Sequence, residues 1–193
     1  HAHFATVAAH VAHGVGALTG LPFSVTCHAK DIYRQGIDPA QFRALLAPAA
    51  FVVTVCEANR RWIENELAGE PSLRLEVLYN GVDTQRFHPR NRTAAERPFL
   101  LAVGRLVEKK GFHLLLDALA ALAARGIAPR CMVVGDGEQR EALLRQRDAL
   151  GLEHVQFVGM RTQDEVCELL RAARMMVLPC IVGDDGNRDA LPT

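Results

Sequence analysis

A cationic loop lies near the middle of the chain, between a segment expected to be a strand and one expected to be a helix. The apolar run Phe99–Val103 is typical of a buried strand, and Gly104, Arg105 and the pair Lys109-Lys110 follow it before a helical pattern begins. Glycine lets the backbone approach an anion closely, while cations and the first N–H groups of a helix favour negative charge. The loop therefore predicts a phosphate site, with an ordinary surface turn as the alternative.

A second glycine turn follows the next segment expected to be a strand. Gly135-Asp136-Gly137 would lie at the same sheet edge as the Arg105 loop, because the carboxyl ends of parallel strands share an edge. A dinucleotide fingerprint would need a glycine where Arg140 stands, and the P-loop pattern of nucleotide hydrolases does not occur in the sequence. Hydride transfer with a nicotinamide and P-loop hydrolysis are therefore not favoured. The alternative is that Gly135 and Gly137 only shape the turn.

A histidine occupies the end of an earlier predicted strand. The strand is Phe23–Cys27, and the sequence continues with His28, Lys30 and Asp31. Open α/β sheets place ligand-contacting residues at this end of their strands, so His28 is a candidate for contact with a substrate. A lone histidine in this position can equally be a structural residue with satisfied hydrogen bonds, and both interpretations stand at this point.

Two further groups of residues have side chains that bind metal ions in other proteins. Asp184-Asp185 could hold a divalent cation together with substrate phosphates, but adjacent acids in a glycine-rich loop are more often only solvated. His1 and His3 lack a third ligand, and a strand edge or a remnant of an expression sequence explains them equally well. We therefore predict no metal site.

Composition narrows the class of protein. The 193 residues are 49% hydrophobic, and Lys plus Arg equals Asp plus Glu at 22 each. Proteins that bind nucleic acids usually carry a basic excess, so no nucleic-acid partner is predicted. The five cysteines form no C-x-x-C pair, which fits a reducing cytosol. No run approaches the ~18 apolar residues of a spanning helix, so any membrane contact is expected to be peripheral.

The alternation of strand and helix patterns predicts an α/β protein with two parallel sheets and helices on both of their faces. The polar, aperiodic segment 90–97 is interpreted as a linker between an N-terminal domain, 1–89, and a C-terminal domain, 98–193. Helices are expected at 6–18, 39–46, 57–67, 113–124, 139–150 and 163–173, and strands at 23–27, 51–55, 73–78, 99–103, 131–134, 155–158 and 175–178.

Several segments, in this order along the chain, resemble the family 4 glycosyltransferases, which have the two-domain GT-B fold. The resemblance rests on residues 54–57, 77–83, 87, 89, 99–111, 133–140 and 155–159. The segment from Arg188 to Thr193 resembles the start of the family's E-x7-E motif, with Asp189 in place of the first glutamate. The chain is therefore expected to be a piece of a longer GT-B enzyme that lacks both ends and is inactive in isolation.

The resemblance implies transfer of a hexosyl group from a nucleotide-diphosphate sugar to a saccharide or lipid-linked acceptor, with retention of configuration and without a cofactor or metal ion. Arg105 and Lys110 would hold the donor's diphosphate and neutralise the charge that grows on the leaving group. Gly104 and Gly135 would let the backbone approach that group. If the departing phosphate accepts the acceptor's proton, no separate strong base is needed.

The resemblance also assigns the remaining contacts with the donor. His28, in the N-terminal acceptor domain, would contact the donor sugar near the reacting carbon. Asp189 would hydrogen-bond the sugar hydroxyls, although its side chain is one methylene shorter than that of glutamate. The backbone around Gly159 and Met160 would meet the base.

Two other functions are compatible with a GT-B fold. A nucleotide-sugar binding module without turnover is one alternative, because the sequence contains only the first acid of the E-x7-E motif. A nucleotide-sugar epimerase is the other, although no convincing pair of acid and base carboxylates is present. The leading hypothesis is a cytoplasmic glycosyltransferase of polysaccharide or glycolipid assembly whose membrane contact, if any, is peripheral on the inner face.

Overall fold

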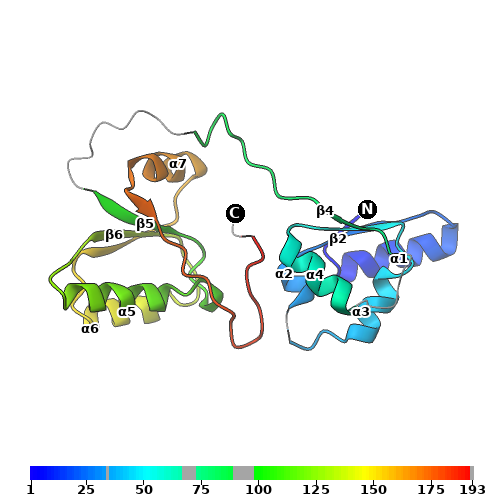
Figure 1. The fold of residues 1–193 in the computed structure, drawn as a ribbon, viewed down its shortest axis with the longest axis horizontal. Coiled ribbons are helices and arrows are strands. Elements are labelled where there is room, and N and C mark those ends of the chain that lie inside the picture. Colours follow the sequence, from blue (N-terminus) through cyan, green and yellow to red (C-terminus); the bar gives the residue numbers. More distant parts are fainter. Residues whose placement is uncertain (34, 67–72, 89–97, 192–193) are drawn as a thin grey trace. The chain divides into compact units, whose positions relative to one another are not determined.

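The computed structural model describes residues 1–33, 35–66, 73–88 and 98–191 (Figure 1). Contacts divide the chain into two compact units. The first joins His1–Gly81 to the segment that begins at Val182, and the second is Val82–Ile181. The domain boundaries expected from the sequence stay a prediction, and the expected linker, 90–97, lies outside the described residues.

The first unit is built on a four-stranded parallel sheet with the order β1-β2-β3-β4. Its inner strands are the most deeply buried, since Val25, Cys27 and Val52 are inaccessible to solvent. Strands covered on both faces are expected to read as continuous apolar runs, as these do. The strands are β1 (Ala2–His3), β2 (Ser24–Cys27), β3 (Phe51–Thr54) and β4 (Leu75–Val77), and the helices are α1 (Val7–Thr19), α2 (Ala29–Ile32), α3 (Pro39–Leu46) and α4 (Glu57–Glu66).

Local sequence sets the ends of the helices in this unit. The Asp38 carboxylate accepts a hydrogen bond of 2.8 Å from the N–H of Ala40, and Pro39 is the first helical residue, so α3 begins where the sequence predicts. Gly20 ends α1 in the left-handed conformation, with a φ of 74°. In the part of the chain that the structure describes, no helix is long and apolar enough to cross a membrane.

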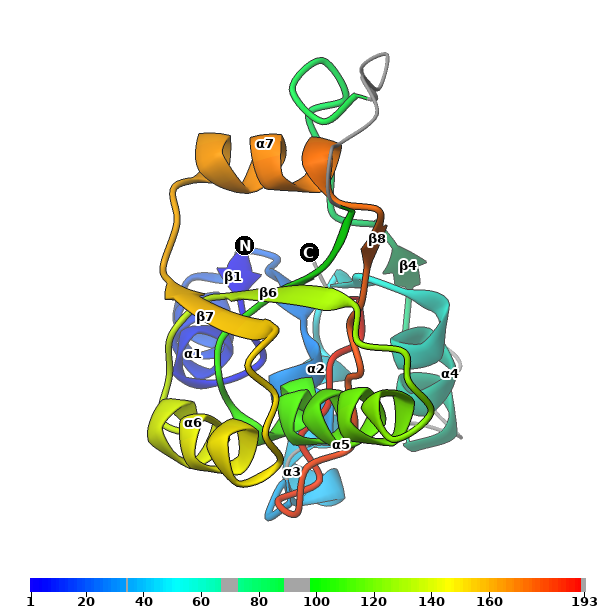
Figure 2. The same cartoon turned by 90° about the vertical axis from the view of Figure 1, so that its left-hand side faces the viewer.

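The second unit is built on a parallel sheet with the order β7-β6-β5-β8. Helices α5 and α6 cover one face of this sheet and α7 covers the other, as predicted (Figure 2). Leu116 and Leu143 belong to the core on the first face, and Leu169 packs on the second. The elements are β5 (Phe99–Val103), a 3-10 turn η1 (Glu108–Lys110), α5 (Phe112–Ala123), β6 (Arg130–Val134), α6 (Arg140–Ala149), β7 (Val155–Gly159), α7 (Gln163–Ala172) and β8 (Met175–Met176).

The structure differs from the sequence prediction at four short elements. β1 and α2 are not predicted, because a two-residue strand and a four-residue helix are too short to have a periodic pattern. β1 is defined by its pairing with β2, in which Ala2 lies beside Val25. The expected strand 175–178 is wrong at its end, since only Met175 and Met176 pair with β5. The expected strand 73–78 is wrong at both ends, since β4 comprises only Leu75–Val77.

The two faces of α5 make an unequal contribution to stability. Leu116 is 1% exposed in the core, whereas Leu114 on the same helix is 45% exposed. Leu116→Ala is expected to lower the free energy of unfolding by about 3 kcal/mol, because it removes buried methyl groups and leaves a cavity. Leu114→Ala is expected to change it by less than about 0.5 kcal/mol. Urea titrations of both variants check this, and equal losses would contradict the assignment of the buried face.

Candidate functional site

Three strand ends of the second unit lie side by side at the carboxyl edge of its sheet. The hydrogen-bond ladder continues past the strands, because the N–H of Gly104 donates to the carbonyl of Val134 (3.0 Å) and the N–H of Gly135 donates to the carbonyl of Gly159 (2.9 Å). The prediction that both glycine turns share one sheet edge is therefore confirmed. Gly104, Gly135 and Gly159 form one row of backbone at this edge.

Two of these loops approach one another more closely than side chains permit. A Cβ atom on Gly135 would lie 1.9 Å from the carbonyl oxygen of Gly104, and the φ of Gly135 is +134°. A Cβ atom on Gly137 would lie 2.5 Å from the carbonyl oxygen of Leu106. The N–H of Leu106 in turn donates to the carbonyl of Asp136 (2.9 Å). The glycines are therefore required for the contact of the two loops, which goes beyond the turn-forming role considered from the sequence.

The cationic loop folds back over the end of β5. Its 3-10 turn, Glu108–Lys110, places the aliphatic part of Lys110 across Gly104, with Cδ 3.5 Å from the position of a Cβ atom on that glycine. Lys110 is half-buried by this packing, while Arg105 is exposed directly after the strand. Two cationic side chains thus come from one loop at the glycine edge, where a phosphate group would gain from their charge.

The far side of the loop is fixed by the chain after β8. A Cβ atom on Gly111 would lie 2.0 Å from the carbonyl oxygen of Pro179. The N–H of Ile181 donates to the carbonyl of Lys109 (2.9 Å). The loop is therefore held on one side by the Gly135 turn and on the other by the segment around Pro179, which favours a rigid cradle over a loose surface turn.

The predicted base-binding segment follows β7. Gly159 has a φ of +74°, and Met160 after it is 75% exposed. The carbonyl of Met160 accepts a hydrogen bond from Nη1 of Arg161 (2.8 Å). This segment begins in the same row of strand ends as Gly104, but its role toward a base stays a prediction.

His28 lies in the first unit, at the carboxyl end of β2, as predicted. Its Nε2 is 2.9 Å from Nε2 of His3, and its ring is half-buried. Burial lowers the pKa of the His28 imidazole, the neighbouring His3 lowers it further, and Asp31 opposes both effects. The ring is therefore neutral at neutral pH.

Asp31 fixes the backbone around His28. The carboxylate is 3% exposed, and its Oδ2 accepts hydrogen bonds from the N–H groups of His28 (3.0 Å) and Ala5 (3.1 Å). Burial, together with Asp31, raises the pKa of the neighbouring Cys27 thiol. Cys27 therefore stays protonated and is not a candidate nucleophile.

Asp189 lies in the segment after Val182, which belongs to the first unit. The guanidinium of the preceding Arg188 lies 4.2 Å from the ring centroid of Tyr33. The N–H of Gln35 donates to the carbonyl of Asp185 (2.8 Å). These contacts hold the segment against the loop that follows α2, and Asp189 itself is half-buried.

The groups considered as metal ligands have other contacts. Oδ1 of Asp185 accepts a hydrogen bond from the N–H of Asn187 (2.9 Å), which closes a tight turn. The His1 ring contacts Ser24 Oγ (2.7 Å) and Thr26 Oγ1 (2.9 Å). Within the described ranges, no group of three or more His, Cys, Asp or Glu side chains could hold a metal ion.

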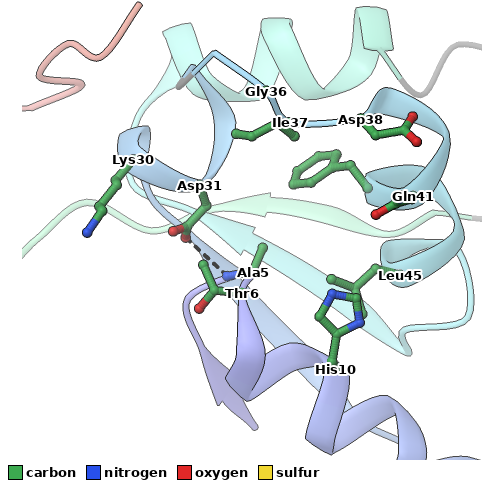
Figure 3. Close-up of a pocket in the computed structure, with 11 residues that line it drawn as sticks. Ala5, Thr6, His10, Lys30, Asp31, Gly36, Ile37, Asp38, Gln41 and Leu45 are labelled. Atoms are coloured by element: carbon green, nitrogen blue, oxygen red, sulfur yellow. Dashed lines mark hydrogen bonds between the residues drawn. The ribbon is translucent and has the colours of Figure 1, made fainter. Parts of the chain in front are cut away.

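A pocket of about 270 Å³ lies at the carboxyl edge of the first unit's sheet, between α1, α2 and α3 (Figure 3). Polar side chains surround it, and Phe42 and Leu45 supply apolar wall. The polar lining comes from Thr6, His10, Lys30, Asp31, Asp38 and Gln41. The sequence prediction missed this pocket, and its only sequence signal is that Lys30 and Asp31 follow β2 close to His28.

The predicted site residues therefore fall into two groups. The second unit brings together Gly104, Lys110, Gly135 and Gly159 at one sheet edge, with Arg105 in the same loop and Met160 next to Gly159. The first unit holds His28 and Asp189. The sequence prediction did not assign a role to His3 or Asp31, which contact His28 in the structure.

Comparison with known families identifies the chain. Residues 83–189, which include the cationic loop, both glycine turns and Asp189, match the family described as Glycosyl transferases group 1. The chain belongs to this family. The glycosyltransferase character expected from the resemblance is thereby supported at the level of the family.

Two curated relatives of this group 1 chain are named for the biosynthesis of colanic acid and of amylovoran. The putative colanic acid biosynthesis glycosyltransferase WcaL of Escherichia coli K12 is 33% identical over 126 residues, which are 64% of this chain and 31% of the relative. The amylovoran biosynthesis glycosyltransferase AmsK of Erwinia amylovora is 29% identical over 172 residues, 86% of this chain and 41% of the relative. The chain thus matches 31% of the length of WcaL and 41% of the length of AmsK.

Solved structures of glycosyltransferases share the fold of this group 1 chain. HepE of Anabaena, solved in complex with UDP and glucose, matches with a TM-score of 0.71 at 20% identity, over 93% of this chain and 52% of HepE. The sucrose-phosphate synthase of Thermosynechococcus elongatus matches with a TM-score of 0.74 at 18% identity, over 92% of this chain and 49% of the synthase. Both have the GT-B fold, so the predicted fold class is confirmed.

The close approach at Gly135 predicts a specific loss of stability. Gly135→Ala is expected to lower the free energy of unfolding by roughly 3 kcal/mol or more, because the new methyl group would overlap the carbonyl of Gly104. Gly126→Ala is the matched control, since Gly126 also has a positive φ (+76°) but nothing within 4 Å of its Cβ position. That variant is expected to lose only about 1 kcal/mol. Equal losses in urea titrations would argue against the loop contact.

Proposed function

We propose that this chain is the catalytic part of a retaining family 4 glycosyltransferase that transfers a hexosyl group from a nucleotide-diphosphate sugar. The observation that carries the proposal is the row Gly104, Gly135 and Gly159, with Lys110 folded across Gly104 and Arg105 beside it. This row lies within the segment that matches the group 1 family. The complex of HepE with UDP and glucose supports a nucleotide-sugar donor.

In the proposed reaction, the donor's diphosphate lies at the glycine edge of the second unit. Cleavage of the glycosidic bond leaves negative charge on the diphosphate, and Arg105 and Lys110 neutralise that charge as it develops. Because η1 and the Pro179 contact fix the loop, little reorganisation accompanies the charge separation. The two cations replace the metal ion that other diphosphate sites use, and no cofactor takes part.

The proton of the acceptor hydroxyl passes to the departing phosphate oxygen. Attack of the acceptor on the same face as the leaving group gives retention and brings the hydroxyl next to that oxygen. The reaction then needs no separate carboxylate base. The first unit contributes His28 near the reacting carbon and Asp189 toward the sugar hydroxyls.

A neutral His28 suits this position. The sugar acquires positive charge when the leaving group departs, and an imidazolium at this place would repel it. The lowered pKa of His28 keeps the ring uncharged at neutral pH. Its function would be to orient the sugar by hydrogen bonding, with no role as a strong acid.

The pocket in the first unit is the proposed acceptor site (Figure 3). Its lining combines acids, a lysine, an amide and a hydroxyl with the apolar walls of Phe42 and Leu45, a composition that suits a sugar with polar edges and apolar faces. WcaL and AmsK, which are named for colanic acid and amylovoran biosynthesis, support a saccharide or lipid-linked acceptor. We place the enzyme in the cytoplasm, with at most peripheral contact with the inner membrane face.

The roles of the two cations can be tested in the complete enzyme. Arg105→Ala and Lys110→Ala are each expected to lower kcat/KM by roughly 10²- to 10³-fold, because each removes a charge that stabilises the leaving group. Lys109→Ala removes the same charge from the same short turn and is expected to cost less than about fivefold. Steady-state kinetics with circular dichroism as a folding control distinguish the variants. Rates near wild type in both Arg105→Ala and Lys110→Ala would refute the assignment.

A second measurement distinguishes the transferase from the alternative of a binding module without turnover. Calorimetric titration with UDP and GDP measures donor-site binding, and a coupled assay measures release of the nucleoside diphosphate from UDP- and GDP-sugars in the presence of acceptor. The transferase predicts both binding and release. Binding without release by the complete protein would favour the module.

The proposed use of two cations also predicts resistance to chelation. Activity in excess EDTA is expected to equal activity in its absence, because Arg105 and Lys110 supply the positive charge at the diphosphate. The assay should be repeated with added Mg²⁺ and Mn²⁺. Loss of activity in EDTA that either ion restores would overturn the metal-independent mechanism and direct attention to Asp184 and Asp185.

A further inference from the structure

Two imidazole rings meet at the carboxyl edge of the first unit's sheet. Nε2 of His3, at the end of β1, lies 2.9 Å from Nε2 of His28, at the end of β2. The ring centroids are 4.7 Å apart with an interplanar angle of 50°. At this distance the N–H of one Nε2 donates and the other Nε2 accepts, so only one of the two Nε2 atoms carries the hydrogen.

A strained turn beside His3 completes the arrangement. Phe4 has a φ of +82°, which is uncommon for an aromatic residue and costs on the order of 1–2 kcal/mol. Its ring centroid lies 4.9 Å from those of both His3 and His28. The N–H of Phe4 donates to the carbonyl of Thr26 (3.0 Å), which prolongs the pairing of β1 with β2 by one residue. The turn thus packs an aromatic ring against the histidine pair.

Asp31 ties this turn to the backbone of His28. One carboxylate oxygen of Asp31 accepts from the N–H of Ala5, directly after Phe4, and from the N–H of His28. Because Asp31 is 3% exposed, water competes little for these bonds. The backbones that carry the two rings are therefore fixed relative to each other by a buried group.

We propose that His3 is a positioning residue for His28, whose hydrogen bond at Nε2 fixes the orientation and tautomer of the ring that contacts the donor sugar. The proposal rests on the proposed function. His3 touches His28 and acts through it, while Phe4 and Asp31 restrict the remaining freedom of both rings.

The pair also has a consequence for pH dependence. Within this unit, the titratable groups that act on His28 are His3 from β1 and Asp31 from α2. Protonation of both rings would leave two donors and no acceptor across 2.9 Å, with like charges in contact, so the pair would separate. His3 lowers the pKa of His28, and its removal therefore raises that pKa toward the ordinary value. Since a neutral His28 is required, the acid limb of the pH profile should move to higher pH without His3.

Two substitutions of His3 distinguish the effect of its hydrogen bond to His28 from the effect of its charge. His3→Leu removes both the hydrogen bond and the titratable group, whereas His3→Gln keeps a polar group that can reach Nε2 of His28 but does not titrate. In the complete enzyme, His3→Leu is expected to lower kcat roughly 10- to 100-fold with little change in KM, and His3→Gln is expected to restore most of that loss. Both variants are expected to shift the acid limb to higher pH. His13→Leu, which removes a histidine that stacks on Phe23, is the control and is expected to match wild type.

A measurement that needs no turnover keeps this proposal distinct from the transferase assignment. Two-bond ¹H–¹⁵N spectra of ¹⁵N-histidine-labelled protein report the tautomer and the pKa of His28. We expect one dominant tautomer in wild type, a mixture with a raised pKa in His3→Leu, and one dominant tautomer in His3→Gln. An unchanged tautomer and pKa of His28 in His3→Leu would overturn the proposal, as would an unchanged kcat. Absence of transfer by wild type would instead refute the proposed function, and the spectra would still decide whether His3 sets the state of His28.

Discussion

The contact between the Gly104 and Gly135 loops is the constraint on which the proposed donor edge of the second unit depends. Gly135 has no Cβ atom, so its backbone can lie against the carbonyl of Gly104, and the strand ladder continues beyond β5 and β6. Lys110 packs over the other side of Gly104. A side chain at position 135 would separate the two loops and move the cationic residues with them. The glycine turn therefore positions the cations indirectly, through backbone packing.

In the first unit, a buried carboxylate, that of Asp31, holds two neighbouring strand ends together. Two strand ends, β1 and β2, must be kept in register where they leave the sheet, and Asp31 does this by accepting from the N–H groups that follow each strand. The backbone N–H groups satisfy Oδ2 of the buried Asp31, whereas its Oδ1 is buried without a hydrogen-bond partner among the described residues. A glycine contact allows loops to approach, whereas a buried carboxylate draws two loops to a fixed distance. The buried carboxylate fixes the backbone of His28, since the N–H of His28 is one of its two hydrogen-bond donors.

Features with a local cause were predictable from the sequence, and features with a distant partner were not. Pro39–Leu46 was predicted to the residue because Asp38 and Pro39 define the helix start locally. The glycine turn at Gly135 was predicted because it follows an apolar run of strand length. In contrast, His3 was considered only as a weak metal ligand, since its partner stands 25 positions away and β1 is too short to have a pattern. Likewise, nothing in the local sequence indicates that Asp31 accepts from Ala5.

The two units carry different electrostatic functions in the proposed reaction. The leaving diphosphate gains negative charge, and the residues assigned to it are an arginine and a lysine of the loop at the glycine edge. The sugar gains positive charge, and the residue assigned to it is an imidazole that burial and His3 keep neutral. A cation at His28 would oppose the step that Arg105 and Lys110 favour. In the proposed reaction, the lowered pKa of His28 therefore serves the same charge separation as the cationic loop. A carboxylate directed at the ring nitrogens would instead raise that pKa, so a histidine pair suits the proposed role better than a histidine–carboxylate pair.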